Sequence, residues 1–566
     1  MLKDLRMDQA LFIARRCRLL KARTGAALAV YYGLAVLNAA IDGVSLVLLI
    51  DLVTGKTPLE SGAPVMDLVT GVLAGLGIAP DYAALYMALM ALFLLRVALM
   101  FAYTAMDGFF EASARRIIQE QGFSSVMAGD WEELRSIRVG ERVGAVTEEA
   151  SNAAKYFMSG ARALYSGLTV LVLSIIALTV SLDVSILFLI IGAPVLIVLR
   201  RLFSLQAKAA EKLVDERQGF YANVTERLHG LFQIKVEGNA AHHVEQGLRN
   251  QKRLTQLEVR WWNLRAVIYA FNVLLPVAVL AAGYGWAAHK GIRLQELMTV
   301  MAGVGVIGAR ALAQLNQLTS NVGNLTGYAG SITPVHALFS IRQEPVKKAV
   351  PEKIRGVEVK DASYMYNEKA GVKRMSLSAF VGSPLIMMGP SGSGKTTLAN
   401  LIAGLYRPAE GAVSYVGESG NAYNSLEYRP KVGYVTQDIH LFHGTVRENL
   451  AASLGSHVDD AWLAERLRQA GAEEFVEEMG GLGAVIAEGG RSLSGGQRRR
   501  LGIARVLTAA PDILILDEVT AGLDEGRKAE LLSTIKRLSE SLVVVMITHD
   551  ALQAGFGTVY AFKHER

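Results

Sequence analysis

Residues 389–397 read GPSGSGKTT and follow a short apolar run, SPLIMM, at 383–388. The stretch fits the pattern G-x-x-x-x-G-K-[ST], and the residues after it, LANLIAGLY, favour a helix. Glycines let consecutive backbone N–H groups wrap around a phosphate, and the start of a helix adds partial positive charge. A strand, a glycine-rich turn and a helix in this order predict a phosphate-binding loop within an α/β domain.

The side chains of this loop predict a bound nucleotide and its metal ion. Lys395 is expected to reach the β and γ oxygens of ATP, and Thr396 to supply a hydroxyl to Mg²⁺. The rest of the loop is expected to surround the phosphates, through Gly389, Ser391, Gly392, Gly394 and Thr397.

Apolar runs alternate with helix-forming stretches downstream of the loop, as in KVGYVTQ, DILILDE and LVVVMITHD. This alternation predicts an α/β domain with a largely parallel sheet. The second run ends in Asp517 and Glu518. A carboxylate at that place can hold Mg²⁺, directly or through water, and the next one can orient or deprotonate an attacking water. We therefore expect ATP hydrolysis, with Glu518 as a catalytic residue and Asp517 as a metal ligand.

The first half of the chain is mostly apolar. The whole sequence of 566 residues is 51% hydrophobic and only 19% charged. Runs of about 20 apolar residues, long enough to cross a bilayer core, are predicted at 25–50, 82–107, 157–181, 184–204, 264–288 and 294–326. They indicate a membrane all-α six-helix domain over 24–330, a linker over 331–355 and an α/β P-loop ATPase domain over 356–566.

Basic residues cluster in the N-terminal arm and in the connections 108–156 and 205–263, whereas the other loops hold few. This asymmetry places both chain ends in the cytoplasm. It also accounts for the net charge of +6, so we expect no nucleic-acid partner. The two connections are predicted to extend the spans as helices, with transverse segments near Ser125–Trp131 and Arg217–Asn223.

The first 23 residues interleave apolar and basic side chains, and no long apolar run follows that would mark a cleaved signal. They predict an amphipathic elbow helix on the inner membrane surface, with lipid-facing Phe12, Ile13, Leu19 and Leu20. The single cysteine, Cys17, excludes an intramolecular disulfide framework and a cysteine-pair zinc site.

Charged residues inside the apolar spans are candidates for a substrate cavity. Asp42, Arg96 and Arg310 are costly in lipid, so they should face a bundle interior or a wet cavity, where Asp42 can pair with an arginine. A polar stripe with helical spacing either lines an aqueous pathway or forms hydrogen bonds between helices. Its members are Arg310, Gln314, Gln317, Asn321 and Asn324.

Residues 493–497 read LSGGQ, which together with the motifs above resembles the signature of the ATP-binding cassette (ABC) family. Six spans followed by one cassette are similar to the exporter-type half-transporters, with a weaker likeness to lipid-linked oligosaccharide flippases. The resemblance implies that two cassettes sandwich two ATP molecules head to tail and that two chains form a domain-swapped dimer. The signature contacts would come from Ser494, Gly495, Gly496 and Gln497.

The same resemblance assigns further roles by motif. It implies that Tyr366 stacks on adenine, with Tyr364 as the competing residue, and that Gln437 touches Mg²⁺ and the attacking water. His549 would contact the γ-phosphate and Asp524 would communicate across the dimer. Glu488 resembles an acid that lies near the cytoplasmic extensions. The segments TAGLD and THD depart from the common TSALD and AHR without removing a catalytic group.

We therefore expect an ATP-driven transporter that exports or flips an amphipathic substrate, such as a lipid-linked glycan, a peptide or a drug, by alternating access. The partners expected are a second copy of the chain and the lipid bilayer, and the expected location is a bacterial inner membrane. An exporter-shaped importer of siderophores or peptides, and one half of a heterodimer, remain alternatives. The six spans argue against a soluble ATPase.

Overall fold

The computed structural model describes residues 2–17, 22–54, 64–180, 182–290, 310, 313–345, 347–367, 370–454, 458–521, 523–549 and 556–562. The chain divides into two compact units, Met1–Gln343 and Glu344–Arg566. The first is called the helical unit below and the second the α/β unit. The division falls inside the predicted linker 331–355, whose first part is helical in η2 (Ala329–Ser331) and α13 (Ile332–Ser340).

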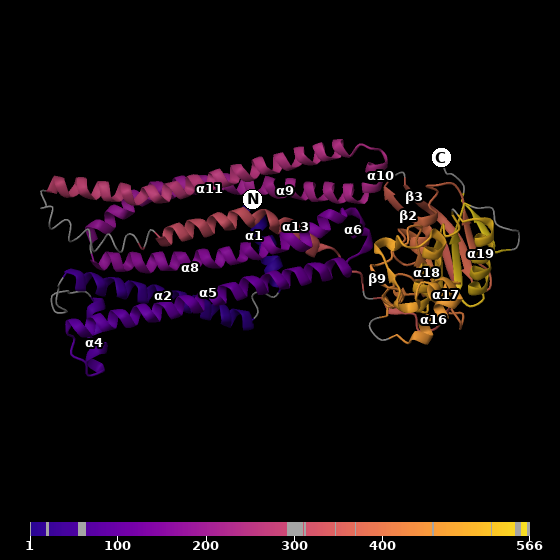
Figure 1. Cartoon of the computed structure of the whole chain (residues 1–566), viewed down its shortest axis with the longest axis horizontal. Coiled ribbons are helices and arrows are strands. Elements are labelled where there is room, and N and C mark those ends of the chain that lie inside the picture. Colours follow the sequence, from indigo (N-terminus) through magenta and orange to yellow (C-terminus); the bar gives the residue numbers. More distant parts are fainter. Residues whose placement is uncertain are drawn as a thin grey trace. The chain divides into compact units, whose positions relative to one another are not determined.

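Long helices dominate the helical unit and run alongside one another (Figure 1). Three of them, α5, α9 and α11, hold 46, 48 and 51 residues. At 1.5 Å per residue each is roughly 70–75 Å long, more than twice the thickness of a hydrocarbon core. The bounds are α2 (Ala22–Thr54), α5 (Tyr82–Met127), α8 (Ala150–Val180), α9 (Leu182–His229) and α11 (Ala240–Lys290).

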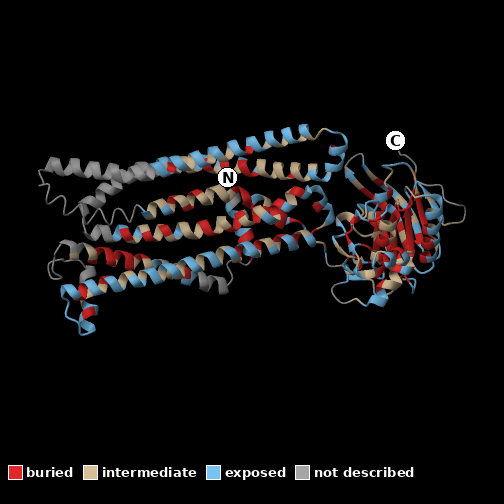
Figure 2. Ribbon diagram, viewed as in Figure 1, coloured by how far each residue is buried: buried red, intermediate tan, exposed pale blue. Residues whose placement is uncertain are grey.

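Three segments among the described residues are long and apolar enough to cross a membrane: Ala29–Leu49, Tyr82–Met127 and Val139–Ile175. They contain or overlap the first three predicted spans. Many large apolar residues of these helices are exposed; Phe101, for instance, is 76% exposed. Figure 2 shows exposed residues along the long helices. An apolar exterior of this kind is typical of helices surrounded by lipid.

The other predicted spans are only partly described. The fourth and fifth lie in α9 and α11. Most of the sixth lies outside the described residues, and its described remainder is helical at 310 and over 313–326.

Short elements separate the long helices at their ends. The connection after α5 contains α6 (Trp131–Ser136), α7 (Val139–Gly144) and the π-helix η1 (Ala145–Glu149). The expected transverse segment Ser125–Trp131 overlaps the break between α5 and α6. The second expectation, Arg217–Asn223, is wrong, because those residues lie inside the continuous helix α9. The chain turns only at α10 (Leu231–Val236), which glycines flank at 230 and 238.

The N-terminal helix α1 (Leu2–Arg16) packs against α13. Ile13, expected to face lipid, is fully buried in a cluster with Val335 and Phe339, so that expectation is wrong. Phe12 is partly exposed, and the predicted Leu19 and Leu20 lie outside the described residues. Another short helix, α4 (Pro64–Gly75), follows α2.

A parallel sheet of five strands forms the core of the α/β unit, in the order β13-β4-β12-β11-β8. Every residue of β11 and β12 is buried, which explains their continuous apolar sequences. A second, antiparallel sheet has the order β3-β2-β5-β6. The parallel strands are β4 (Leu385–Met388), β8 (Val432–Val435), β11 (Ile513–Asp517), β12 (Val543–Ile547) and β13 (Thr558–Ala561); the antiparallel ones are β2 (Ile354–Asn367), β3 (Ala370–Phe380), β5 (Glu410–Gly417) and β6 (Ala422–Asn424).

Because β4, β12, β11 and β8 are neighbours and parallel, their carboxyl ends meet along one edge of the sheet. In open α/β sheets this edge is where ligands bind. The four segments that follow these strands carry the motifs singled out in the sequence.

Candidate functional site

The phosphate loop joins the end of β4 to the start of α14 (Lys395–Ile402). Gly394 has a φ of +93°, and a Cβ there would lie 2.3 Å from Cγ1 of Val372. Both the backbone angle and the close approach therefore require glycine at this position. Gly389, Ser391 and Gly392 form the preceding turn, and Thr397 lies in the first turn of α14.

Lys395 is 6% exposed, and its Nζ donates hydrogen bonds to the backbone oxygens of Gly389 (2.8 Å) and Pro390 (2.7 Å). Burial lowers the pKa of Lys395, although the nearby carboxylates of Glu518 and Asp517 oppose that shift. In the part of the chain that the structure describes, the ammonium forms no salt bridge. A buried cation in this position is suited to an incoming phosphate, which would supply the missing negative charge.

Thr396 and Asp517 form the pair of oxygen ligands expected for Mg²⁺. The Thr396 hydroxyl donates a hydrogen bond to Oδ2 of Asp517 over 3.3 Å. Burial raises the pKa of Asp517, while the Thr396 hydrogen bond and the charge of Lys395 lower it. Within the described residues, no group of three or more His, Cys, Asp or Glu side chains lies close enough together to bind a metal ion. These two oxygens fit an ion that takes its remaining ligands from phosphate and water, as Mg²⁺ does.

Glu518 is the centre of a hydrogen-bonded group at the carboxyl edge of the sheet. Its Oε1 lies 2.9 Å from Nε2 of His549, which follows β12, and its Oε2 accepts a hydrogen bond of 2.8 Å from the Gln437 side-chain amide, which follows β8. Gln437 and His549, which are distant from each other in sequence, thus both contact the carboxylate of Glu518. Glu518 has a φ of +51°, a left-handed conformation that is unusual for a residue other than glycine.

The two tyrosines proposed for adenine stacking have different surroundings. Tyr364 is 5% exposed, and its ring is stacked on that of Tyr406 with centroids 4.6 Å apart. Tyr366 is 40% exposed, and its hydroxyl lies 3.2 Å from that of Thr397 in the first turn of α14. Only Tyr366 offers an accessible ring beside the phosphate loop, so the geometry favours it over Tyr364.

The signature residues begin the helix α18 (Gly495–Thr508). Ser494 is its N-cap and forms a capping box with Gln497. Each of the two side chains accepts a hydrogen bond from the backbone N–H of the other residue, so both have a structural role. Ser494 and Gly495 are exposed and Gly496 is buried. Asp524 caps the next helix, α19 (Glu525–Ser539).

Among the described residues, no hydrogen bond or ion pair joins the signature or Asp524 to the phosphate loop of the same chain. The side chain of Glu488, for which a place near the cytoplasmic extensions is predicted, lies outside the described residues.

In the helical unit, Asp42 pairs with Arg96 at 2.8 Å, and their side chains are 4% and 18% exposed. The members of the polar stripe differ in exposure. Asn321 is buried and donates a hydrogen bond to the Ser166 hydroxyl of α8 over 3.3 Å, as expected of a contact between helices. Gln314 and Arg310 are half-buried, and Gln317 is exposed.

A polar cluster that the sequence reasoning missed joins α2, α5 and α8. Arg162 donates hydrogen bonds to Oδ1 (3.0 Å) and Oδ2 (2.9 and 2.6 Å) of Asp107 and to Glu111 (2.6 Å). The buried Tyr31 donates a hydrogen bond of 3.0 Å to the same aspartate. The available signal was a charge at position 162, inside the predicted span 157–181.

A phosphate loop, a strand-end carboxylate pair and residues from two neighbouring strand ends define the α/β unit as a P-loop ATPase domain. The ABC transporter family model matches residues 372–521. The chain also aligns with a solved structure of a bacterial Atm1-family ABC exporter with ATP bound, with a TM-score of 0.73 and 18% identity over 94% of this chain and 92% of the other. This match confirms the predicted ABC exporter fold.

Curated relatives agree with this family. An uncharacterised ABC transporter ATP-binding protein, YwjA of Bacillus subtilis, is 29% identical over 350 residues. An ATP-dependent lipid A-core flippase of Vibrio cholerae is 36% identical over 202 residues. The alignments cover 60% of this chain and 60% of the first relative, and 35% of this chain and 35% of the second, so each spans less than two thirds of its relative's length.

We predict that Arg96→Leu destabilises the helical unit by roughly 3 kcal/mol, because it leaves the buried Asp42 carboxylate without its partner. Thermal unfolding in lipid nanodiscs measures the effect. The matched control is Arg116→Leu, whose pair with Glu120 is 3.7 Å apart and mostly exposed, and which should cost less than about 1 kcal/mol. Equal losses in the two variants would contradict a buried ion pair.

We predict that Tyr366→Ala weakens ATP binding about tenfold without lowering thermal stability, because it removes an accessible stacking ring. Tyr364→Ala should instead lower stability, since it removes a ring packed on Tyr406 in the core. Nucleotide titration and thermal unfolding of both variants separate the two effects. Unchanged affinity in Tyr366→Ala would exclude this ring from the adenine site.

Proposed function

We propose that the chain is half of an ATP-driven membrane transporter that hydrolyses ATP at the carboxyl edge of its parallel sheet. The observation that carries this proposal is the Glu518 carboxylate, which holds His549 at 2.9 Å and Gln437 at 2.8 Å beside the phosphate loop. The apolar helices of the first unit and the exporter fold supply the membrane part of the proposal.

In this proposal, Glu518 accepts the proton of the attacking water. Its Oε2 already accepts one hydrogen bond, from Gln437, its Oε1 lies 2.9 Å from Nε2 of His549, and both oxygens have a further lone pair for the water. Gln437 and His549 hold the carboxylate in place, and Lys395 stabilises the charge that develops on the phosphate oxygens. Mg²⁺, held by Thr396 and Asp517, would neutralise charge on the nucleotide.

The proposed transporter contains two chains. Ser494 and Gly495 are exposed at the start of α18, where the first helical N–H groups, those of Gly495 and Gly496, suit a phosphate. Their own chain's loop forms no hydrogen bond with them in the described residues, which supports a site shared with a second copy. Each ATP would then lie between Lys395 of one chain and Ser494 of the other.

We further propose that the substrate is amphipathic. The similarity to a protein named a lipid A-core flippase supports a lipid-linked substrate, exported or flipped across a bacterial inner membrane with both termini in the cytoplasm. An exporter-shaped importer and one half of a heterodimer are the alternatives, and the hydrolysis test below addresses the second. The predicted cavity residues Asp42 and Asn321 have packing partners, so they are more suited to holding helices together than to contacting the substrate.

The first test compares ATP hydrolysis by the wild-type chain and by Glu518→Gln in nanodiscs. Hydrolysis should fall at least 100-fold while ATP still binds, because the substitution removes the proton acceptor but keeps the shape of the side chain. The control is Glu525→Gln, an exposed acid at the start of α19, which should retain full activity.

Lipid-linked glycans, peptides and drugs are then added in turn. Stimulation by one class would name the substrate class. If the wild-type protein binds ATP but does not hydrolyse it, two identical chains do not form an active ATPase.

The shared site is tested by mixing two inactive variants. Lys395→Ala and Ser494→Arg chains should each lose hydrolysis as homodimers. A mixed dimer regains one of its two sites and should recover up to about half of the wild-type rate per dimer. Colorimetric phosphate release from co-expressed, doubly tagged dimers gives the rate. No recovery in the purified mixed dimer would mean that each chain builds its site alone.

A further inference from the structure

A cavity of about 830 Å³ lies at the amino edge of the parallel sheet, opposite the edge that carries the ATPase residues. Its lining includes Lys431, which precedes β8, Asp512, which precedes β11, and Leu542, which precedes β12. The five residues of β11 separate Asp512 from Glu518, a distance of roughly 15–20 Å along a strand. The cavity is therefore distinct from the nucleotide site.

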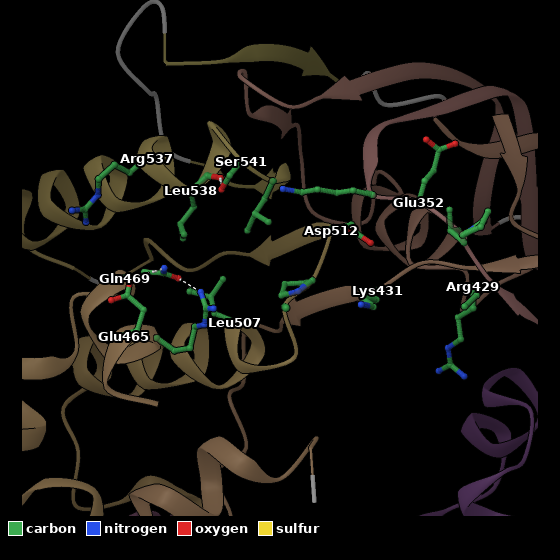
Figure 3. Close-up of a pocket in the computed structure, with 18 of the residues that line it drawn as sticks. Glu352, Arg429, Lys431, Glu465, Gln469, Leu507, Asp512, Arg537, Leu538 and Ser541 are labelled. Atoms are coloured by element: carbon green, nitrogen blue, oxygen red, sulfur yellow. Dashed lines mark hydrogen bonds between the residues drawn. The ribbon is translucent and has the colours of Figure 1, made fainter. Parts of the chain in front are cut away.

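The lining of this cavity is rich in cations. It includes Lys353, Arg429, Lys431, Arg466, Arg468 and Arg537, against three carboxylates. Figure 3 shows Lys431, Asp512, Arg429 and Glu352 on one side of the cavity, with Arg537 and Ser541 on another and Glu465 and Gln469 on a third.

Two of the three carboxylates already have other partners. Glu352 accepts hydrogen bonds from Ser419 and from the Tyr423 hydroxyl (2.6 Å). Glu465 pairs with Arg468. Arg429, likewise, pairs with Glu344 at 3.3 Å.

The third carboxylate of the lining, Asp512, lies near Lys431 and Lys353. Lys353 and Lys431 both act on it electrostatically, but neither forms a salt bridge with it in the described chain. Arg466 and Arg537 likewise have no carboxylate partner among the described residues; Arg466 donates to Gln469 (2.6 Å) and Arg537 to Thr534 (3.4 Å).

Some of this positive charge has a structural explanation. Arg466 and Arg537 lie in the last turns of α16 (Asp460–Gln469) and α19, where cations favour the helix dipole. Lys353 and Lys431 precede strands, so no helix end accounts for them. The Nε of Arg466 is buried without a hydrogen-bond partner, and burial lowers the pKa of that side chain. The Arg466 guanidinium is half-buried and lies over the Trp462 ring, 3.7 Å from its centroid, whereas Lys353, Lys431 and Arg537 are exposed.

The remaining walls of the cavity are apolar and come from Val350, Pro351, Leu507, Leu538 and Leu542. A cavity of this size, with apolar walls and a few convergent charges, has the composition of a small-molecule site. The volume exceeds what inorganic phosphate needs, and the apolar walls would contact an organic body.

We propose that this cavity binds an organic phosphate with more than one negative charge, held mainly by Lys431, Lys353, Arg466 and Arg537. It is a second anion site on the same ATPase domain, separate from the site that holds ATP. The inference does not depend on the proposed transport function, because its residues take no part in hydrolysis.

Binding is measured by equilibrium dialysis of labelled fructose 1,6-bisphosphate against the full chain in phosphatidylcholine nanodiscs. The chain carries Lys395→Ala so that the phosphate loop contributes little. We expect saturable binding of one molecule per chain. Lys431→Glu should weaken it at least tenfold and Arg537→Gln severalfold, whereas Asp512→Asn should strengthen it severalfold by removing the opposing negative charge.

The matched control is Lys360→Glu, a charge reversal of an exposed lysine on β2 that lies outside the cavity and should leave binding unchanged. Thermal unfolding checks that each variant is folded, and tighter binding by Asp512→Asn cannot arise from misfolding. The proposal is overturned by an absence of saturable binding, by equal losses in Lys360→Glu and Lys431→Glu, or by unchanged binding in Asp512→Asn. The nanodiscs are also prepared with the anionic lipid phosphatidylglycerol in place of phosphatidylcholine. If the bisphosphate then no longer binds, the lipid headgroup occupies the cavity, and the proposal of a soluble organic phosphate is overturned.

Discussion

Parallel hydrogen bonding between β4, β12, β11 and β8 is the constraint on which the ATPase site depends. The ladder pairs Asp517 with Ile547 and Ile547 with Met387, so the chain leaves neighbouring strands at almost the same level. Glu518, His549 and the phosphate loop follow within two residues of those positions. Shifting one strand by a residue would reverse the face of every side chain along it and would separate the groups that share the carboxylate.

In the helical unit, charged side chains inside the apolar helices pair with opposite charges on neighbouring helices. Asp42 and Arg96 are paired, and Arg162 bridges two acids on α5. Exposed apolar side chains such as Phe101 cover the outside. A polar residue in a membrane helix is thus weak evidence for substrate contact until its partner is known, as Asn321 shows by bonding to Ser166.

The features that the sequence predicted correctly depend on local patterns. The phosphate loop needs glycines at fixed spacing, and buried parallel strands such as β11 are continuous apolar runs. The failures concern partners distant in sequence. Amphipathic spacing identified an apolar face at Ile13 but could not show that α13 covers it. Helix-forming composition over 205–263 predicted helical extensions but did not show where the helix breaks, so the predicted transverse segment, Arg217–Asn223, falls inside α9. Nothing local linked Arg162 to Asp107.

The backbone of Glu518 shows that the site was not built for maximal stability. Its φ of +51° costs a residue with a Cβ about 1 kcal/mol relative to glycine, at the end of a fully buried strand. Glycine would relax the backbone but would remove the carboxylate that His549 and Gln437 contact. Selection for thermostability alone would therefore favour Glu518→Gly, which removes the carboxylate proposed to activate water. A screen for stabilising substitutions in this domain should therefore also measure ATP hydrolysis.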